Sequence, residues 1–174
     1  DTKGPMSSEI TEEAKVASDL NQKGEEGEPE FDAAWLAEGG KILVVNDDVG
    51  NRDLLTRRLG RHGYDAVAVE SGENALALLE TDRFDLILLD LIMPDGISGL
   101  ETLEVLKADK RLRTIPVIML TAADSVDSMV QCVLKGADDY IFKPFNPVLL
   151  RARIGACLEK VRLRRQVTNS SSRL

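Results

Sequence analysis

The chain has 174 residues and a formal net charge of −8, which allows one domain with a hydrophobic core and tails but not two ordinary domains. Hydrophobic residues make up 43% and aromatic residues 4%, so a wholly disordered chain is excluded and the core must consist of Leu, Val, Ile and Ala. With two cysteines, no apolar run near a membrane span and no export signal, we expect neither a disulfide framework nor membrane insertion, and a cytoplasmic location.

The negative charge is concentrated at one end of the chain. Residues 1–40 hold 11 acidic and 3 basic residues, which is the entire −8, and their Glu, Lys, Ser and Gly composition predicts a largely disordered acidic tail. Within this tail, Phe31, Trp35 and Leu36 form either one apolar helical turn that docks on the domain or part of a linker. We expect the folded domain at residues 41–163 and a basic tail, or the start of a linker, at residues 164–174.

Two kinds of hydrophobic pattern alternate from residue 41 onward. Short apolar runs predict strands, and apolar residues at helical spacing between capping residues and glycines predict helices. The first half predicts a strand at 41–45, a helix at 51–59 that stops at Gly60, a strand at 65–69, a helix that Ser71 caps and a strand at 85–90. The second half predicts a helix with Leu100, Leu103 and Leu106, a strand at 116–120, a helix at 126–133 that ends near Gly136, a strand at 139–142 and a helix that Asn146 caps and Pro147 opens.

Five strands that alternate with five helices indicate a parallel sheet covered on both faces, because each crossover must return the chain to the same end of the sheet. The predicted fold is therefore a doubly wound α/β sandwich of the (βα)5, flavodoxin-like type with a five-stranded parallel sheet. In such folds the functional site forms just beyond the carboxyl ends of the strands.

Residues with reactive or charged side chains occur at these strand ends. They are Asn46, Asp47 and Asp48 after the first strand, Asp90 after the third, Thr121 after the fourth and Lys143 after the fifth. Carboxylates that lie close together repel one another unless a cation joins them, and Mg²⁺, which prefers oxygen ligands, fits this group. Beside Mg²⁺, Asp90 can act as a nucleophile toward phosphorus, while Lys143 and Thr121 meet the charge on the phosphoryl oxygens.

Four motifs in this order resemble those of the response-regulator receivers of bacterial two-component signalling. They are ILVVND at the first strand, LILLDLIMP around Asp90, VIMLTAAD around Thr121 and GADDYIFKPF around Lys143. The resemblance covers residues 41 to about 163, and each motif lies at the end of a predicted strand.

The resemblance implies a role for each matching residue. Asp90 would be the phosphoacceptor, Thr121 and Lys143 would bind the phosphoryl group, and Tyr140 would be an aromatic switch that reorients with Thr121 on activation. A phosphohistidine on a sensor histidine kinase or phosphotransfer protein would be the donor, so the chain would be no enzyme beyond its own phosphorylation and dephosphorylation. Mg²⁺ would be held by Asp47, Asp90, the position of Asn46 and the backbone carbonyl of Ile92.

The sequence departs from the family pattern at two places. Asn46 stands where receivers usually have the first of two acidic residues, so we expect weaker Mg²⁺ binding that Asn46→Asp restores modestly, on the assumption that this position is partly exposed. The segment Asp95 to Gly99 lengthens the loop beside Asp90 by about one residue. The resemblance also predicts a cis Lys143-Pro144 bond.

Plainer interpretations remain open for several of these residues. Asp48 is either a further site acid or a solvated neighbour, and Thr121 is either a phosphate ligand or a helix-entry residue near Asp124. Tyr140 suits packing in a short strand as well as a switch. Cys132 and Cys157 suit helix packing better than redox chemistry.

Three other functions compete with the receiver interpretation. A flavin binder of the same fold would be repelled by Asn46-Asp47-Asp48, and a haloacid-dehalogenase-type phosphatase would need an acid where Ile92 stands. A receiver-like module that binds partners without being phosphorylated is the alternative that the Asn46 departure leaves open.

The last helix offers two uses for its apolar positions Leu150, Ile154, Cys157 and Val161, whose spacing of four, three and four is a heptad seam. They form a homodimer seam or the face against the sheet, and burial is the expected use of the first half. The segment around them resembles connectors that lead from receivers into class III nucleotide cyclases or other signalling output domains. Because no helix-turn-helix pattern follows, we expect no direct nucleic-acid binding.

Overall fold

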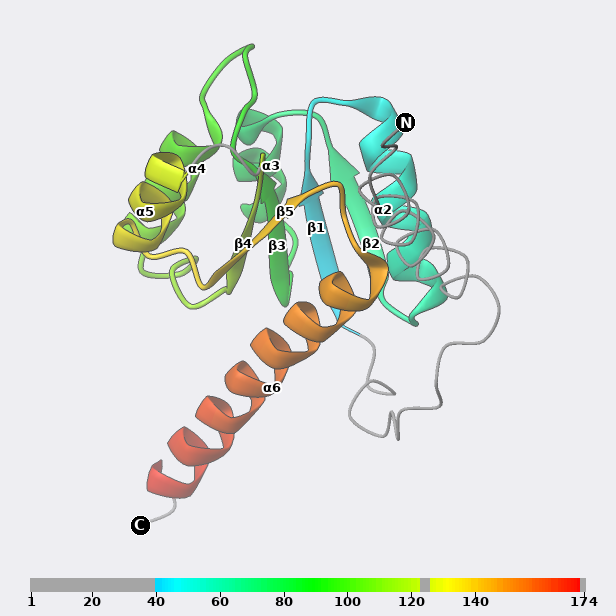
Figure 1. The fold of residues 1–174 in the computed structure, drawn as a ribbon. Coiled ribbons are helices and arrows are strands. Elements are labelled where there is room, and N and C mark those ends of the chain that lie inside the picture. Colours follow the sequence, from blue (N-terminus) through cyan, green and yellow to red (C-terminus); the bar gives the residue numbers. More distant parts are fainter. Residues whose placement is uncertain (1–39, 123–125, 173–174) are drawn as a thin grey trace, which may run out of the picture.

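A computed structural model describes residues 40–122 and 126–172, and the predicted acidic tail with Phe31, Trp35 and Leu36 lies outside these residues, as does Asp124. The described chain forms one parallel sheet with the strand order β2-β1-β3-β4-β5 (Figure 1). The strands are β1 (Lys41–Val45), β2 (Asp65–Val69), β3 (Leu86–Asp90), β4 (Val117–Ala122) and β5 (Asp139–Lys143). The predicted strands and the doubly wound α/β sandwich are confirmed.

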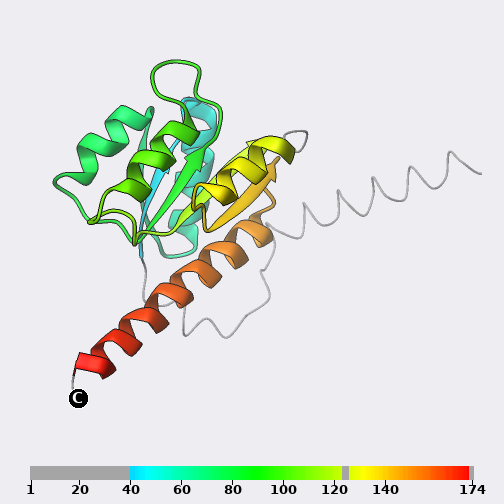
Figure 2. The same cartoon turned by 90° about the vertical axis from the view of Figure 1, so that its left-hand side faces the viewer.

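In the described residues, five helices cover the two faces of this sheet. Buried side chains place α3, α4 and α5 on one face and α2 and α6 on the other, an arrangement that Figure 2 shows from the side of α4 and α5. The helices are α2 (Val49–Arg61), α3 (Gly72–Leu79), α4 (Gly99–Ala108), α5 (Val126–Leu134) and α6 (Pro147–Ser172). In the described part of the chain, no helix is long and apolar enough to cross a membrane.

The strands that carry the site are the most deeply buried. Ile42 to Val45 of β1 and Leu86 to Leu89 of β3 have no exposed surface, and β4 is buried from Val117 to Thr121. Their continuous Val, Leu and Ile runs are typical of strands packed on both faces. The polar residues that follow are therefore held at the edge of a rigid apolar core.

Helix ends follow the predicted capping residues with one exception. Ser71 caps α3 by accepting the Asn74 N–H at 3.1 Å, and Asn146 accepts two N–H groups at the start of α6. The prediction that Gly60 stops α2 is wrong, because α2 continues to Arg61 and Gly63 adopts the left-handed φ of 87° instead.

The Lys143-Pro144 bond is cis, which agrees with the prediction, and the last helix begins three residues after Pro144, at Pro147. Leu150, Ile154 and Cys157 are buried against the sheet, so the first half of the heptad pattern is used for packing within the chain. The helix runs on without a break beyond position 163 and extends past the sheet (Figures 1 and 2).

Candidate functional site

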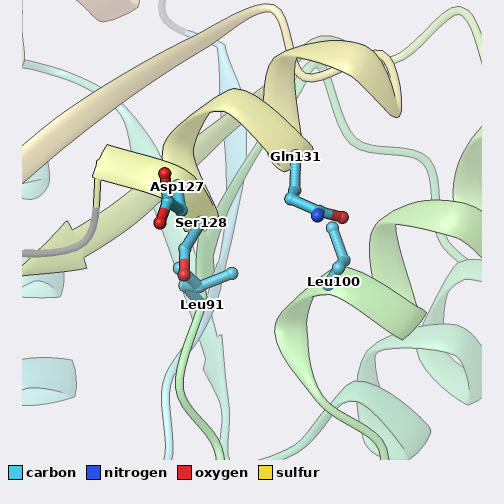
Figure 3. Close-up of a pocket in the computed structure, with 5 residues that line it drawn as sticks. All are labelled: Leu91, Leu100, Asp127, Ser128 and Gln131. Carbon is cyan, nitrogen blue, oxygen red and sulfur yellow. The ribbon is translucent and has the colours of Figure 1, made fainter.

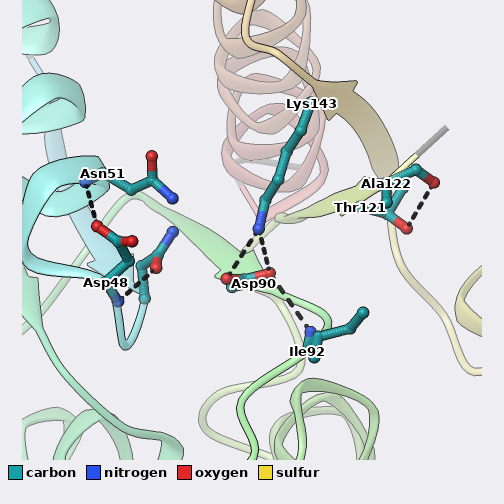
Figure 4. A network of polar contacts seen from close by, with 8 residues as sticks. Asp48, Asn51, Asp90, Ile92, Thr121, Ala122 and Lys143 are labelled. Carbon is teal, nitrogen blue, oxygen red and sulfur yellow. Dashed lines mark hydrogen bonds and ion pairs between the residues drawn. The ribbon is translucent and has the colours of Figure 1, made fainter.

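The carboxyl edge of the sheet brings Asp90 and Lys143 together from 53 residues apart. Asp90 is the last residue of β3, lies between β1 and β4, and is 2% exposed. Lys143, the last residue of β5, points back across β4 and places Nζ 3.0 Å from both carboxylate oxygens of Asp90 (Figure 4). The Ile92 N–H donates to Oδ1 of Asp90 at 3.3 Å.

The negative charge of Asp90 is disfavoured by its surroundings. Burial raises the pKa of its carboxyl above the ordinary value, and the nearby charge of Asp47 raises it further. The hydrogen bond and charge of Lys143, followed by the Ile92 N–H, oppose this rise but do not cancel it. Lys143 is therefore the main group that keeps this buried carboxylate in its anionic form.

The loop after β1 supplies Asn46, which is fully buried, and the exposed Asp47 and Asp48. The Asp48 carboxylate accepts the Asn51 N–H at 3.0 Å and caps α2, so the structure gives Asp48 a role in the helix rather than at the acid cluster. Oδ1 of Asn46 accepts the Asp48 N–H at 2.9 Å, whereas Nδ2 is buried without a hydrogen-bond partner among the described residues.

Thr121 and Tyr140 lie near the site but do not complete it. Thr121 is 2% exposed, and Figure 4 shows its hydroxyl directed to the Ala122 carbonyl, at 3.4 Å, rather than to Asp90. The ring of Tyr140 packs edge-on against Phe142 with a centroid distance of 5.3 Å, and the Arg153 guanidinium lies 5.5 Å from its centroid. The phosphate role of Thr121 and the switch role of Tyr140 stay predictions.

Two arginines from α2 fix the loops that carry the site, and the sequence analysis did not single them out. Arg52 donates to the Asn46 carbonyl at 2.8 Å, and Arg58 donates to the Phe145 carbonyl at 3.0 Å, directly after Lys143-Pro144. The second contact joins residues 87 apart, so no local pattern could have revealed it. α2 thus braces both flanks of Asp90.

Within the part of the chain that the structure describes, no group of three or more His, Cys, Asp or Glu side chains could hold a metal ion. The site offers the two carboxylates of Asp47 and Asp90, and Asn46 contributes an amide where a third carboxylate would otherwise stand. Two carboxylates with water are sufficient for Mg²⁺ but not for an ion that needs a cage of protein ligands.

This fold and this site define a class of protein. Residues 42–155 match the family model of the response regulator receiver domain, and the chain belongs to that family. It is similar to the phosphate regulon transcriptional regulatory protein PhoB of Pseudomonas aeruginosa (41% identity over 122 residues, 70% of this chain and 53% of the relative). It is also similar to the DNA-binding response regulator MtrA of Mycobacterium tuberculosis (42% over 120 residues, 69% and 51%).

Among solved structures, the signal receiver domain of a histidine kinase from Syntrophus aciditrophicus matches with a TM-score of 0.66 and 36% identity, covering 71% of this chain and 92% of that one. The predicted receiver of two-component signalling is thereby confirmed. Receivers generally bind Mg²⁺ at the phosphorylation site and are not enzymes in the usual sense.

The prediction that the protein does not bind nucleic acid directly is wrong on the evidence of these relatives, which are named for transcriptional regulation and DNA binding. The chain spans about half the length of the curated relatives it matches. A missing helix-turn-helix within these residues therefore says nothing about the rest of such a protein. The relatives also give no support to the predicted connector into a nucleotide cyclase.

Proposed function

We propose that Asp90 accepts the phosphoryl group of the receiver. The observation that carries this proposal is the buried carboxylate of Asp90, both oxygens of which lie 3.0 Å from Nζ of Lys143. A purely structural acid at this place would disfavour folding, because burial opposes its charge. A nucleophile that must stay anionic until it reacts explains both the burial and the partner.

The proposed reaction moves one phosphoryl group. An oxygen of Asp90 attacks phosphorus while the bond from phosphorus to the leaving group breaks; with a phosphohistidine donor, the electron pair goes to the imidazole nitrogen. The Lys143 ammonium, which pairs with the carboxylate before the reaction, then stabilises the negative charge on the phosphoryl oxygens. Thr121 has to give up only its contact of 3.4 Å with the Ala122 carbonyl, which is too long for a strong hydroxyl hydrogen bond.

The residues at this edge fit Mg²⁺. Asp47 adds to the rise in the pKa of the buried Asp90 carboxyl, so its negative charge lies near enough to act on Asp90. A cation between them would relieve this repulsion. When bound, Mg²⁺ would offset the charge of the carboxylate and the incoming phosphoryl group. The residues that would hold it are Asp47, Asp90, the Ile92 carbonyl and, directly or through water, the position of Asn46.

We further propose that residues 41–163 act as the receiver of a transcriptional regulator, with a sensor histidine kinase as phosphoryl donor. The names of the curated relatives support this output, and the match of the chain to about half of their length leaves room for a separate DNA-binding part. Phosphorylation of Asp90 would control that part.

The test uses the chain with Mg²⁺ and acetyl phosphate, a small phosphoryl donor. Wild-type protein is expected to gain the mass of one phosphate, and Asp90→Asn none, because the amide is not a nucleophile toward phosphorus. Asp85→Asn is a suitable control, since Asp85 also adjoins β3 but caps its opposite end by accepting the Lys41 N–H. Equal labelling of wild type and Asp90→Asn would exclude Asp90, and labelling of neither would favour an unphosphorylated interaction module.

Asn46→Asp is expected to bind Mg²⁺ more tightly than wild type. The assumption that this position is partly exposed is wrong, because Asn46 has no exposed surface. The new carboxylate is therefore costly without a cation, and Mg²⁺ should raise the melting temperature of the variant more than that of wild type. The expected gain in affinity is on the order of tenfold, about 1.4 kcal/mol.

Calorimetric titration of Mg²⁺ into wild type, Asn46→Asp and Asp48→Ala measures this effect. Asp48→Ala removes a helix cap, so it should cost about 1 kcal/mol of folding stability and leave Mg²⁺ affinity nearly unchanged. Weaker binding by Asn46→Asp together with a large loss in Asp48→Ala would show that Asp48 is the site acid.

A further inference from the structure

The loop between Asp90 and α4 is tied to the start of α3 by one carboxylate. Oε1 of Glu73 accepts the backbone N–H of Ile97 at 2.7 Å, across 24 residues. This hydrogen bond is the largest cause that lowers the pKa of the Glu73 carboxyl below its ordinary value, so the acceptor is charged at neutral pH. The loop concerned comprises residues 91–98.

The backbone geometry on both sides of this contact fits it closely. Gly96 has a left-handed φ of 85°, and a Cβ there would lie 2.4 Å from Oε1 of Glu73. A Cβ on Gly72 would lie 2.9 Å from the Ile97 side chain and 2.1 Å from Oγ1 of Thr102. The loop and the start of α3 can therefore approach this closely only because Gly96 and Gly72 have no side chain.

The loop returns to Asp90 at its other end. The Gly99 N–H donates to the Leu91 carbonyl at 3.1 Å, and the Ile92 N–H donates to Oδ1 of Asp90 at 3.3 Å. The Ile92 side chain is 60% exposed, so packing of that side chain does little to fix the backbone there. Core packing of Leu91 and Met93 holds the backbone on either side of Ile92, and the segment beyond Met93 is held by the contact at Ile97.

On the side that faces α5, the loop borders a pocket. A pocket of about 210 Å³ lies between the loop, α4 and α5 (Figure 3). Its lining residues are Leu91, Leu100, Asp127, Ser128 and Gln131. The loop is therefore fastened through Glu73 on the α3 side and has free space beside Leu91.

We propose that Glu73 is a positioning residue for phosphoryl transfer. By holding Ile97, it sets the loop so that the backbone of Ile92 stays beside Asp90, with its N–H on Oδ1. When Mg²⁺ is bound, the Ile92 carbonyl would be one of its ligands. This inference rests on the proposed function of Asp90. Since Glu73 is itself exposed, its loss should alter the loop with little effect on global stability.

The experiment compares Glu73→Ala, Glu73→Gln and the control Glu70→Ala. Gln keeps an oxygen that accepts the Ile97 N–H, whereas Ala has none. Glu70 is a neighbouring acid whose contact, to Asn74 at 3.5 Å, lies within its own segment. Initial rates of labelling by acetyl phosphate are measured over a range of Mg²⁺ concentrations, together with hydrogen exchange of residues 91–98.

Glu73→Ala should lower the labelling rate by about tenfold or more, as small misplacements of reacting groups do, and should require more Mg²⁺ for half the maximal rate. Exchange of residues 91–98 should become faster, Glu73→Gln should recover most of the rate, and Glu70→Ala should match wild type. Equal rates for Glu73→Ala and wild type, or equal impairment of Glu73→Gln and Glu73→Ala, would overturn the proposal while leaving Asp90 in place. If wild type itself is not labelled, the proposed function of Asp90 is wrong. Independently of labelling, unchanged hydrogen exchange of residues 91–98 in Glu73→Ala would show that Glu73 does not hold the loop.

Discussion

Lys143→Met is expected to lower the initial rate of phosphoryl transfer to Asp90 by about a hundredfold to a thousandfold, the usual effect of removing one preorganised charge-stabilising donor. Nζ of Lys143 lies 3.0 Å from each carboxylate oxygen and is the main group that opposes the rise in the pKa of Asp90. Met keeps much of the length and apolar stem of Lys but removes the charge and the donors. The carboxylate is then left buried without its cationic partner.

The measurement is the rate of labelling by acetyl phosphate at saturating Mg²⁺, followed by intact mass. Lys160→Met, at an exposed position on α6, controls for the loss of one positive charge from the chain. The variant should also need a higher pH than wild type for its maximal rate, because without Lys143 the pKa of Asp90 rises further and deprotonation shifts upward. Unchanged rates in Lys143→Met would remove Lys143 from the mechanism.

Gly99→Ala is expected to destabilise the fold by about 3 kcal/mol, at the upper end of the usual cost of overpacking. A Cβ on Gly99 would lie 2.1 Å from the carbonyl oxygen of Asp90 and 2.7 Å from Cα of Leu91. Both are backbone atoms, so no rotamer change can relieve the clash. Either α4 moves away from β3, or the backbone that carries Asp90 is displaced.

Urea unfolding of Gly99→Ala and Gly60→Ala tests this account with a matched pair. Gly60 lies inside α2, and a Cβ there would meet nothing within 4 Å. Gly60→Ala should therefore stabilise the fold by up to about 1 kcal/mol through helix propensity. If both substitutions stabilise, the contact between α4 and the Asp90 carbonyl is looser than the structure shows.

The core of the fold could be predicted because its signals are local. Continuous apolar runs such as 85–90 are long enough for a strand and too short for a typical helix, and their alternation with helical patterns leaves a parallel sheet as the simplest arrangement. Once the sheet is parallel, Asp90 and Lys143 must end at the same edge. Their pairing followed from topology, although they are 53 residues apart.

Contacts between loops and helices could not be predicted in this way. The tether from Glu73 to Ile97 and the brace from Arg58 to Phe145 each join one side chain to a distant backbone group, and such partners leave no periodic pattern. The stop of α2 was misplaced for a related reason. Gly60 and Gly63 are both reasonable helix stops by sequence. In the structure it is Gly63 that adopts the left-handed φ of 87°, directly before Tyr64, which is 6% exposed.

The burial of Asn46 could not be predicted from the sequence either. A polar residue after a strand is usually partly exposed, but here the Arg52 side chain covers its carbonyl and its Nδ2 is buried without a hydrogen-bond partner in the described structure. The buried amide of Asn46 stands where receivers usually have an acidic residue, so the predicted Mg²⁺ site departs from the family pattern at this position.

The most direct measurement of the central claim is to trap the phosphorylated residue. Borohydride reduces an aspartyl phosphate to homoserine, so protein treated with acetyl phosphate and Mg²⁺ and then with borohydride can be digested and sequenced by mass spectrometry. Homoserine at position 90, dependent on the phosphoryl donor, is the result we predict. Homoserine at position 47 or 48 instead, with Asp90 unmodified, would contradict the assignment of the phosphoacceptor.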